Sequence, residues 1–256
     1  MIQCLDKKTL IIAHRGSSAY EIDNTLDSFQ RAIDQKADMI EFDVRRTKDN
    51  VIIAFHDPAV SRTPVRELTY AELNELTKAK GYLVPTLKEI LQLTHRKIRL
   101  DIELKEPGYE ADVMKLVEKY FCAADFIVTS FKDTCLATIK EISDDIKTGL
   151  LLGEDRFNNF LLTNRSLSHL VERCRRTQAD FLVPSMTLLR FGFMKRVADL
   201  KKNLIVWTVN DNESIFKLLK DSRVNAIITD KPDIGVSLRD TLSFPVFMSI
   251  ACQKIS

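Results

Sequence analysis

Four short segments of the sequence each bring charged or imidazole side chains to the end of an apolar run. They lie at residues 11–16, 41–43, 56–57 and 100–105. Together they supply two histidines, at least three carboxylates, an arginine and a lysine. Because apolar β-branched runs become buried, we expect the polar residues at their ends to meet at one rim of a sheet or barrel. Such a set suits a divalent metal, a phosphate group and proton transfer, so the sequence indicates metal-dependent phosphodiester chemistry.

The carboxylates Glu41, Asp43 and Glu103 are the predicted metal ligands. In a strand over residues 39–44, alternation places Glu41 and Asp43 on the same face. Two carboxylates ~4 Å apart repel by about 4 kcal/mol at an effective dielectric constant of ~20, and a cation between them removes that cost. Hard oxygen donors without a thiol favour Mg²⁺ or Ca²⁺ over zinc or iron. Asp101 is either a fourth ligand or a carboxylate behind the ligands, and a solvated polar strand face is the alternative for the whole set.

Two histidines and two basic residues complete the predicted site. His14 and His56 are the expected acid and base, because imidazole titrates nearest to neutral pH. Arg15 can hold two phosphate oxygens with its planar guanidinium, and Lys105 can add a point charge. A single histidine at a strand end is more often structural, but a pair, each beside a charged residue, favours a catalytic role.

Other polar and aromatic residues near strand ends have weaker signals. Trp207 and Phe131 are candidates to line the alcohol side of the pocket, with ordinary packing as the alternative for each. His95 and His169 are expected to be surface or helix residues. Ser130 lacks the G-x-S-x-G setting of a hydrolase elbow, so we do not expect it to be a nucleophile.

Predicted strands and helices alternate along the chain. Apolar runs predict strands at 10–13, 39–44, 51–55, 98–104, 126–129, 148–152, 181–183, 204–209 and 226–228. Helical spacing of apolar residues and capping signals predict helices from 24–25, 69–72, 86–89 and 210–213, around 136–139 and 167–174, and within 188–200. The turn at 47–50 is too short for a parallel crossover, so strands 39–44 and 51–55 should form a hairpin that returns His56 toward Glu41 and Asp43.

This alternation, without a Gly/Ser-rich linker, indicates a single parallel sheet of the α/β class. About nine strands less one hairpin partner leaves close to eight, and a (β/α)8 TIM barrel suits a chain of this length, with its site at the carboxyl ends of the strands. A doubly wound open sheet is the alternative, but no Gly-rich phosphate fingerprint follows the first strand. We expect one domain over 1–256, with its core at about 10–235 and an apolar tail at 244–256.

Composition excludes several other classes of protein. The chain is 45% hydrophobic and 29% charged, and its net charge of +2 gives no reason to expect a nucleic-acid partner. Its 5 cysteines are odd in number and form no CxxC pair, which favours reduced thiols in the cytoplasm. The first eight residues do not resemble a signal peptide, and no apolar stretch is long enough to span a membrane. The apolar tail is expected to pack on the barrel or stay unordered, with transient membrane contact as the less favoured alternative.

The sequence resembles the glycerophosphodiester phosphodiesterase family, within the phosphatidylinositol-phospholipase-C-like barrels. The matching segments lie in order at 13–16, 24–29, 40–44, 47–49, 56–57, 62–63, 85–87, 102–105, 206–210 and 228–232. The resemblance implies a TIM barrel that hydrolyses a small-molecule glycerophosphodiester to glycerol 3-phosphate and an alcohol, in lipid and glycerol metabolism. It also implies a divalent cation on Glu41, Asp43 and Glu103, catalysis by His14 and His56, and phosphate binding by Arg15 and Lys105, beside Trp207 on the substrate side.

Two departures from the family pattern affect these expectations. The family usually reads Pro-Glu-Asn-Thr where this chain reads Ile22-Asp23-Asn24-Thr25, so the geometry of the metal or of the first loop is expected to differ. Residues 57–84 are short compared with the insertion that often covers the pocket, and a more open pocket would admit larger lysophospholipids. The alternatives are therefore a lysophospholipase D-like or sphingomyelinase D-like activity on lipids, or a non-catalytic phosphoester-binding protein. The sequence leaves open the leaving alcohol, the attacking oxygen and the oligomeric state.

Overall fold

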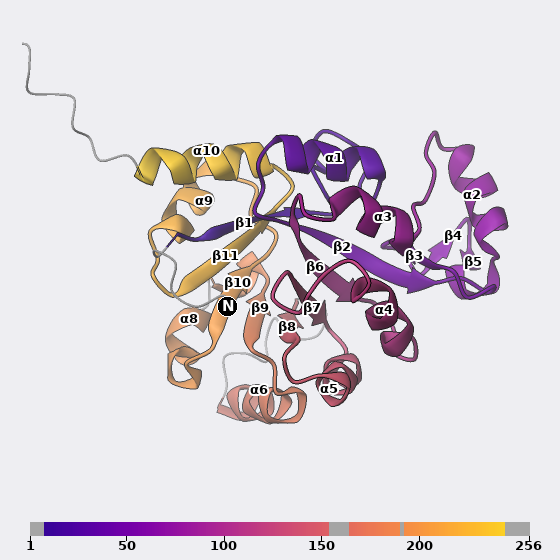
Figure 1. Cartoon of the computed structure of the whole chain (residues 1–256). Helices are drawn as coiled ribbons and strands as arrows, with labels where there is room; N and C mark the ends of the chain where they lie inside the picture. Colours follow the sequence, from indigo (N-terminus) through magenta and orange to yellow (C-terminus); the bar gives the residue numbers. More distant parts are fainter. Residues whose placement is uncertain (1–7, 154–163, 190–191, 244–256) are drawn as a thin grey trace, which may run out of the picture.

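The computed structural model describes residues 8–153, 164–189 and 192–243. The expectations for the first seven residues and for the tail at 244–256 concern residues outside these ranges. Within the described residues, eight parallel strands close into a barrel that is surrounded by helices (Figure 1). The predicted (β/α)8 barrel is therefore confirmed.

The barrel closes because β1 pairs with both β2 and β11. Its strands are β1 (Leu10–His14), β2 (Met39–Arg46), β6 (Arg99–Leu104), β7 (Phe126–Ser130), β8 (Lys147–Leu152), β9 (Phe181–Pro184), β10 (Asn203–Val206) and β11 (Val224–Thr229). The additional strand β3 (Ile52–Ala54) runs antiparallel to β2, with Val44 opposite Ala54. This pair is the hairpin expected from the short turn.

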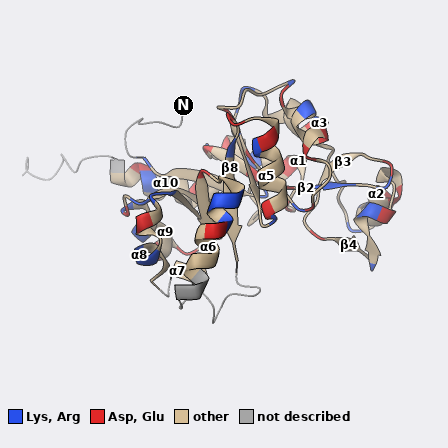
Figure 2. Cartoon of the chain, turned by 90° about the horizontal axis from the view of Figure 1, so that it is seen from below, with Lys and Arg blue, Asp and Glu red and all other residues tan. Residues whose placement is uncertain are grey.

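The helices lie on the outside of the barrel, with acidic and basic residues interspersed on helices such as α5 and α6 (Figure 2). They are α1 (Leu26–Asp34), α2 (Tyr70–Lys78), α3 (Leu87–Thr94), α4 (Glu110–Val117), α5 (Asp133–Ile142), α6 (Asn164–Thr177), α7 (Met186–Leu189), α8 (Phe193–Arg196), α9 (Asn212–Leu219) and α10 (Pro232–Ser243), with 3₁₀ turns at Val65–Glu67 and Ala198–Leu200. Capping boxes begin α2 and α3 at Thr69 and Thr86, as expected. No described helix has the length and apolar character needed to cross a membrane.

The sequence analysis missed or misplaced three helical regions. Neither α4 nor α10 was predicted, and α4 lacks the side-chain cap that helps to identify a helix start. The single helix expected within 188–200 is instead divided into α7, α8 and a 3₁₀ turn. Gly192 separates the first two with a left-handed backbone, which no α-helix continues through.

Alternation along the strands divides the apolar residues between two cores. Inward residues such as Ile12, Met39 and Val183 pack together inside the barrel. Outward residues such as Phe42 pack against the surrounding helices. The alternate positions that hold the carboxylates begin with Met39 on β2 and Arg99 on β6, and they become acidic further along each strand, at Glu41 and Asp43 and at Asp101 and Glu103. The closed sheet therefore places the carboxylates at one mouth of the barrel.

The chain between β3 and α3 forms a small lobe beside the hairpin (Figure 1). It contains α2 and a two-stranded hairpin of β4 (Ala59–Val60) and β5 (Thr63–Pro64). Its apolar residues, including Val60, Leu68 and Leu73, pack with Ile53 of β3 as a separate cluster. No residue of 57–84 lines the pocket described below, so the lobe lies beside the mouth without contributing to its wall.

Candidate active site

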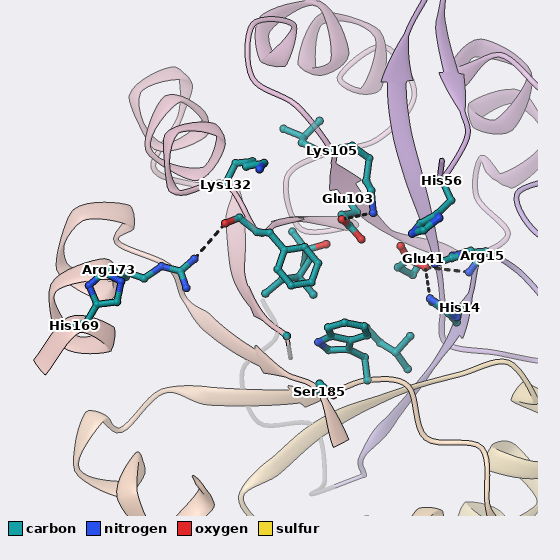
Figure 3. Close-up of a pocket in the computed structure, with 17 residues that line it drawn as sticks. His14, Arg15, Glu41, His56, Glu103, Lys105, Lys132, His169, Arg173 and Ser185 are labelled. Carbon is teal, nitrogen blue, oxygen red and sulfur yellow. Dashed lines mark hydrogen bonds and ion pairs between the residues drawn. The ribbon is translucent and has the colours of Figure 1, made fainter. Parts of the chain in front are cut away.

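A pocket of about 900 Å³ opens at the carboxyl ends of the barrel strands (Figure 3). Seven of the eight residues predicted to form the site line it: His14, Arg15, Glu41, His56, Glu103, Lys105 and Trp207. The eighth, Asp43, is buried next to them, with 1% of its surface exposed. The structure therefore brings together residues that are spread over most of the chain.

Glu41, Asp43 and Glu103 form a buried cluster in which one oxygen from each carboxylate lies within 4.8 Å of the others. Their strands are adjacent, and Asp43 is the register partner of Glu103. Burial raises the pKa of Glu41 well above its usual value, and the neighbouring carboxylates Asp43 and Glu103 raise it further. Burial also raises the pKa of Glu103 to about 7. The cluster therefore resists ionisation unless positive charge is supplied.

Asp43 is the carboxylate that nearby cations hold ionised. Burial alone would raise its pKa, but Lys105 and Arg15 bring the pKa below its usual range. Lys105 Nζ lies 2.9 Å from Asp43 Oδ1 and 2.7 Å from Glu103 Oε1. Arg15 Nε lies 3.1 Å from Asp43 Oδ2, and Asn24 Nδ2 donates to the same oxygen at 2.8 Å. These contacts fix the orientation of the Asp43 side chain.

The donor set of this cluster fits a hard divalent cation. Three carboxylates carry more negative charge than Lys105 and Arg15 offset, and their oxygens are close enough to share one ion. The cluster contains oxygen donors and no sulfur, as Mg²⁺ and Ca²⁺ prefer.

Asp101 lies outside the cluster. The sequence predicted it to be either a fourth ligand or a carboxylate behind the ligands. It is fully buried, it accepts a hydrogen bond from Thr129 at 2.8 Å, and burial raises its pKa to about 8.

His14 is held by a carboxylate that directly follows the neighbouring strand β11. Its Nδ1 lies 2.6 Å from Asp230 Oδ1, and its Nε2 lies 4.0 Å from Glu41 Oε2. Ser18 and Asn210 also donate hydrogen bonds to Asp230. Burial opposes ionisation of Asp230, but these hydrogen bonds, that of His14 foremost, lower its pKa to about 2. Asp230 therefore orients the imidazole and leaves Nε2 for the pocket.

His56 lies just after β3, the second strand of the β2–β3 hairpin, and lines the pocket. Its Nδ1 lies 2.8 Å from Asp57 Oδ1, and its backbone carbonyl accepts two hydrogen bonds from the Arg45 guanidinium, at 2.9 and 2.6 Å. Burial lowers the pKa of His56, which favours the neutral ring. Figure 3 shows His14 and His56 on either side of Glu41 and Arg15.

The loop after β1 positions Arg15 through its backbone as well as its side chain. The Arg15 amide donates to Glu41 Oε2 at 3.0 Å, and its Nη1 lies 3.0 Å from Asp23 Oδ2. Asp23, which stands where the family usually has Glu, thus contacts Arg15 and lies outside the acidic cluster. Gly16 follows with φ +82° in close contact with Ser28. The loop depends on this glycine.

Gly16→Ala is expected to lower the free energy of unfolding by about 3 kcal/mol, as the sum of backbone strain and overpacking. An added Cβ would lie 2.4 Å from Ser28 Oγ and 2.6 Å from the Ser28 carbonyl carbon. Gly81→Ala is the matched control, because Gly81 has φ +91° and nothing within 4 Å of the added Cβ. Urea denaturation measures both variants, and equal losses would contradict the steric argument.

Two aromatic rings line the pocket in contact with each other. Phe131 and Trp207 meet edge to face, with ring centroids 5.6 Å apart, and both line the pocket. Trp207 Nε1 donates to the Val183 carbonyl at 2.8 Å, which fixes the indole. Both residues were candidates for this position. Ser130 is fully buried and donates to the Leu104 carbonyl at 2.6 Å, so its hydroxyl is not available as a nucleophile.

The sequence analysis missed several residues that line the pocket or lie directly behind it. Asp230 and Asn210 were only parts of matched motifs, and Lys132 and Arg173 were not considered. His169 was expected to be a surface or helix residue; it is exposed on α6 but also lines the pocket. The spacing of His169 and Arg173, four residues apart on one helix, is a signal that could have paired them.

The other histidine expected outside the site lies at the opposite end of the barrel strands. His95 caps the end of α3, and its ring packs edge-on against Tyr120 and Phe121. It does not line the candidate active site. His95 is therefore a half-buried residue at a helix end, and it lies outside the site as expected.

Comparison with known proteins gives one consistent result. The sequence profile of the Glycerophosphoryl diester phosphodiesterase family matches residues 14–234. The glycerophosphodiester phosphodiesterase of Caldanaerobacter subterraneus is 31% identical over 253 residues, which cover 90% of this chain and 98% of that protein. YhdW of Bacillus subtilis is 32% identical over 239 residues, covering 87% of this chain and 95% of that protein. The crystal structure of the glycerophosphodiester phosphodiesterase from Thermotoga maritima superposes with a TM-score of 0.74 at 26% identity, covering 90% of this chain and 98% of that chain.

Proposed function

Because the chain belongs to the glycerophosphoryl diester phosphodiesterase family, and is therefore an enzyme that hydrolyses glycerophosphodiesters, we propose that it does so with a divalent cation and two histidines. The products would be glycerol 3-phosphate and an alcohol. The observation that carries this proposal is the convergence of the acidic cluster, the imidazoles of His14 and His56, and the cations of Arg15 and Lys105 on one pocket. A non-catalytic phosphoester-binding protein is not favoured, because the family and the named relatives of this chain are phosphodiesterases.

Glu41, Asp43 and Glu103 would hold the cation, Mg²⁺ or Ca²⁺. When bound there, the cation supplies positive charge that polarises the phosphoryl group and stabilises the charge developing on its oxygens. Arg15 and Lys105 line the pocket and add two donors for phosphate oxygens. Both side chains already contact Asp43, so they are held in place before the substrate arrives.

His14 and His56 would carry the two proton transfers of the reaction. Hydrolysis needs one proton removed from the attacking oxygen and one given to the departing alcohol. Asp230 holds the Nδ1 side of His14, so Nε2 is the nitrogen that exchanges a proton with the substrate. Burial lowers the pKa of His56 and favours its neutral form, so the pair can divide the two transfers between them.

We also propose a cytoplasmic location and a small-molecule substrate for the enzyme. Cys122, Cys135 and Cys174 are free thiols, which fits the reducing cytoplasm. The substrate would be a small molecule, while the pocket volume of about 900 Å³ leaves room for a larger alcohol or a lysolipid.

Release of glycerol 3-phosphate from glycerophosphodiesters tests the proposed reaction. We expect turnover with added Mg²⁺ or Ca²⁺, and a loss of at least about 10²-fold after chelation, since the cation is worth several kcal/mol in the transition state. Readdition of either metal should restore the rate. Long-chain lysolipid substrates, assayed beside substrates that carry only a headgroup, distinguish the lipid alternative. Turnover that is indifferent to chelation would overturn the role of the cation.

A further inference from the structure

The pocket has a second charged wall, which the proposed hydrolysis does not use. Lys132 and Arg173 line it across the pocket from Glu41 (Figure 3). Lys132 follows β7 and precedes the first residue of α5, while Arg173 lies on α6 with its side chain largely buried. The aromatic rings of Phe131 and Trp207 line the same pocket. The wall therefore combines apolar surface with fixed positive charge.

The charges on this wall do not cancel. Arg173 Nε and Nη2 both donate to Asp133 Oδ1, at 2.9 and 2.7 Å, and Arg176 pairs with the same carboxylate. Asp133 thus faces two guanidinium groups. Among the described residues, no carboxylate pairs with the Lys132 ammonium, which is exposed. In the part of the chain that the structure describes, Lys132 and Arg173 line this side of the pocket, and the one carboxylate beside them, Asp133, is shared between Arg173 and Arg176. The described part of the wall therefore keeps a net positive charge, which attracts an anion.

The position of this charge identifies the part of the substrate that it would contact. The phosphodiester is already matched by Arg15, Lys105 and the proposed cation, and the glycerol group is uncharged. The remaining part of the substrate is the alcohol, so a second region of positive charge fits a negative group on that alcohol. A quaternary ammonium would suit the aromatic rings, but here it would face Lys132 and Arg173, which disfavours it.

Resting on the proposed function, we propose that the enzyme prefers glycerophosphodiesters whose alcohol carries an anionic group, a carboxylate or a phosphate, bound by Lys132 and Arg173. Arg173 is tied to Asp133 and to the Phe131 carbonyl, at 3.2 Å from Nη2, so it is a rigid part of the wall. Lys132 has no such carboxylate partner in the described part of the chain, and it supplies most of the discrimination. Both act as specificity-determining residues.

A substrate series on one skeleton tests this preference. Glycerophosphoethanolamine with its amine free, N-acetylated or N-succinylated presents an alcohol of charge +1, 0 or −1, and each compound releases the same glycerol 3-phosphate. We expect the N-succinyl compound to exceed the N-acetyl compound about tenfold in kcat/KM at low ionic strength, with the free amine slowest. High salt should reduce the differences in kcat/KM among the three compounds, because salt screens charges on a partly exposed wall.

Lys132→Gln is expected to reduce the ratio of N-succinyl to N-acetyl kcat/KM about fivefold. Lys119→Gln makes the same change at an exposed lysine that does not line the pocket, and it should leave the ratio unchanged. A wild-type ratio of one or less, or an unchanged ratio in Lys132→Gln, would overturn the inference while leaving the proposed hydrolysis intact. Failure to release glycerol 3-phosphate from all three compounds would instead overturn the proposed function and the inference with it.

Discussion

The variant His14→Gln is expected to lose about 10³-fold in kcat/KM for a glycerophosphodiester, within the range that a positioned acid or base contributes. Glutamine keeps a polar side chain of similar reach, but its amide neither accepts nor releases a proton near neutral pH. The side chain lies in the pocket and is only partly exposed, so the fold should not change. Steady-state rates of glycerol 3-phosphate release give the measurement, with circular dichroism as the check on folding.

Two further variants separate proton transfer from positioning. Asp230→Asn keeps the shape of the group beside His14 Nδ1 but removes its charge, so we expect an intermediate loss of about 10- to 10²-fold, with kcat affected more than KM. His95→Gln changes a histidine that lies outside the pocket and should retain full activity. If His14→Gln kept a tenth or more of the wild-type rate, the proposed role of His14 would be wrong.

The main parts of the site could be predicted because they depend on local patterns. Alternation along β2 and β6 puts Glu41, Asp43 and Glu103 on inward positions, and strand ends in a closed parallel barrel share one mouth. The short turn after β2 required a hairpin, which returns His56 to that mouth. Each of these steps needs only the periodicity of the strands, the length of a loop and the closure of the barrel, so each can be predicted from the sequence.

The missed residues depend on contacts that no local pattern records. Asp230 reaches His14 only because closure pairs the last strand with the first, across a sequence separation of 216 residues. Arg173 reaches the pocket through the packing of α6 against α5, and its role depends on Asp133, a helix-start residue that looks solvated in the sequence. The Arg173 contact follows from the angle at which α6 packs against α5, which the apolar periodicity of a single chain does not fix.

The variant Glu41→Gln is expected to lose about 10³-fold in activity and also the stabilisation that the cation gives to the folded protein. Removing one of three carboxylates weakens the proposed cation site, and the cation is worth several kcal/mol in the transition state. At a cation concentration of about 100 times its dissociation constant, the wild-type protein should gain about 3 kcal/mol in the free energy of unfolding. The variant should gain little, although glutamine can still accept the hydrogen bond from the Arg15 amide.

Glu110→Gln provides the control for this substitution. Glu110 is also a buried carboxylate, and its Oε2 accepts a hydrogen bond from the Gly108 amide at 2.7 Å, but it lies outside the acidic cluster. Its replacement should leave the gain in stability on adding Mg²⁺ or Ca²⁺ unchanged. Thermal unfolding with and without each metal measures this gain. An equal gain in Glu41→Gln and the wild type would show that the cation binds elsewhere.

The acidic cluster also predicts how stability changes with pH once the cation is removed. The pKa of Glu103 is raised from 4.5 to about 7 in the folded protein, and that of Glu41 is raised as well, chiefly by burial. The folded state then binds protons more tightly than the unfolded chain, so the stability of the chelated protein should fall as pH rises from about 4.5 to about 7. Because a bound cation favours the ionised carboxylates, its stabilising effect should grow over the same range. Glu41→Gln removes one of the titrating groups, so its chelated form should lose less stability than the wild type between these pH values, while Glu110→Gln should follow the wild type.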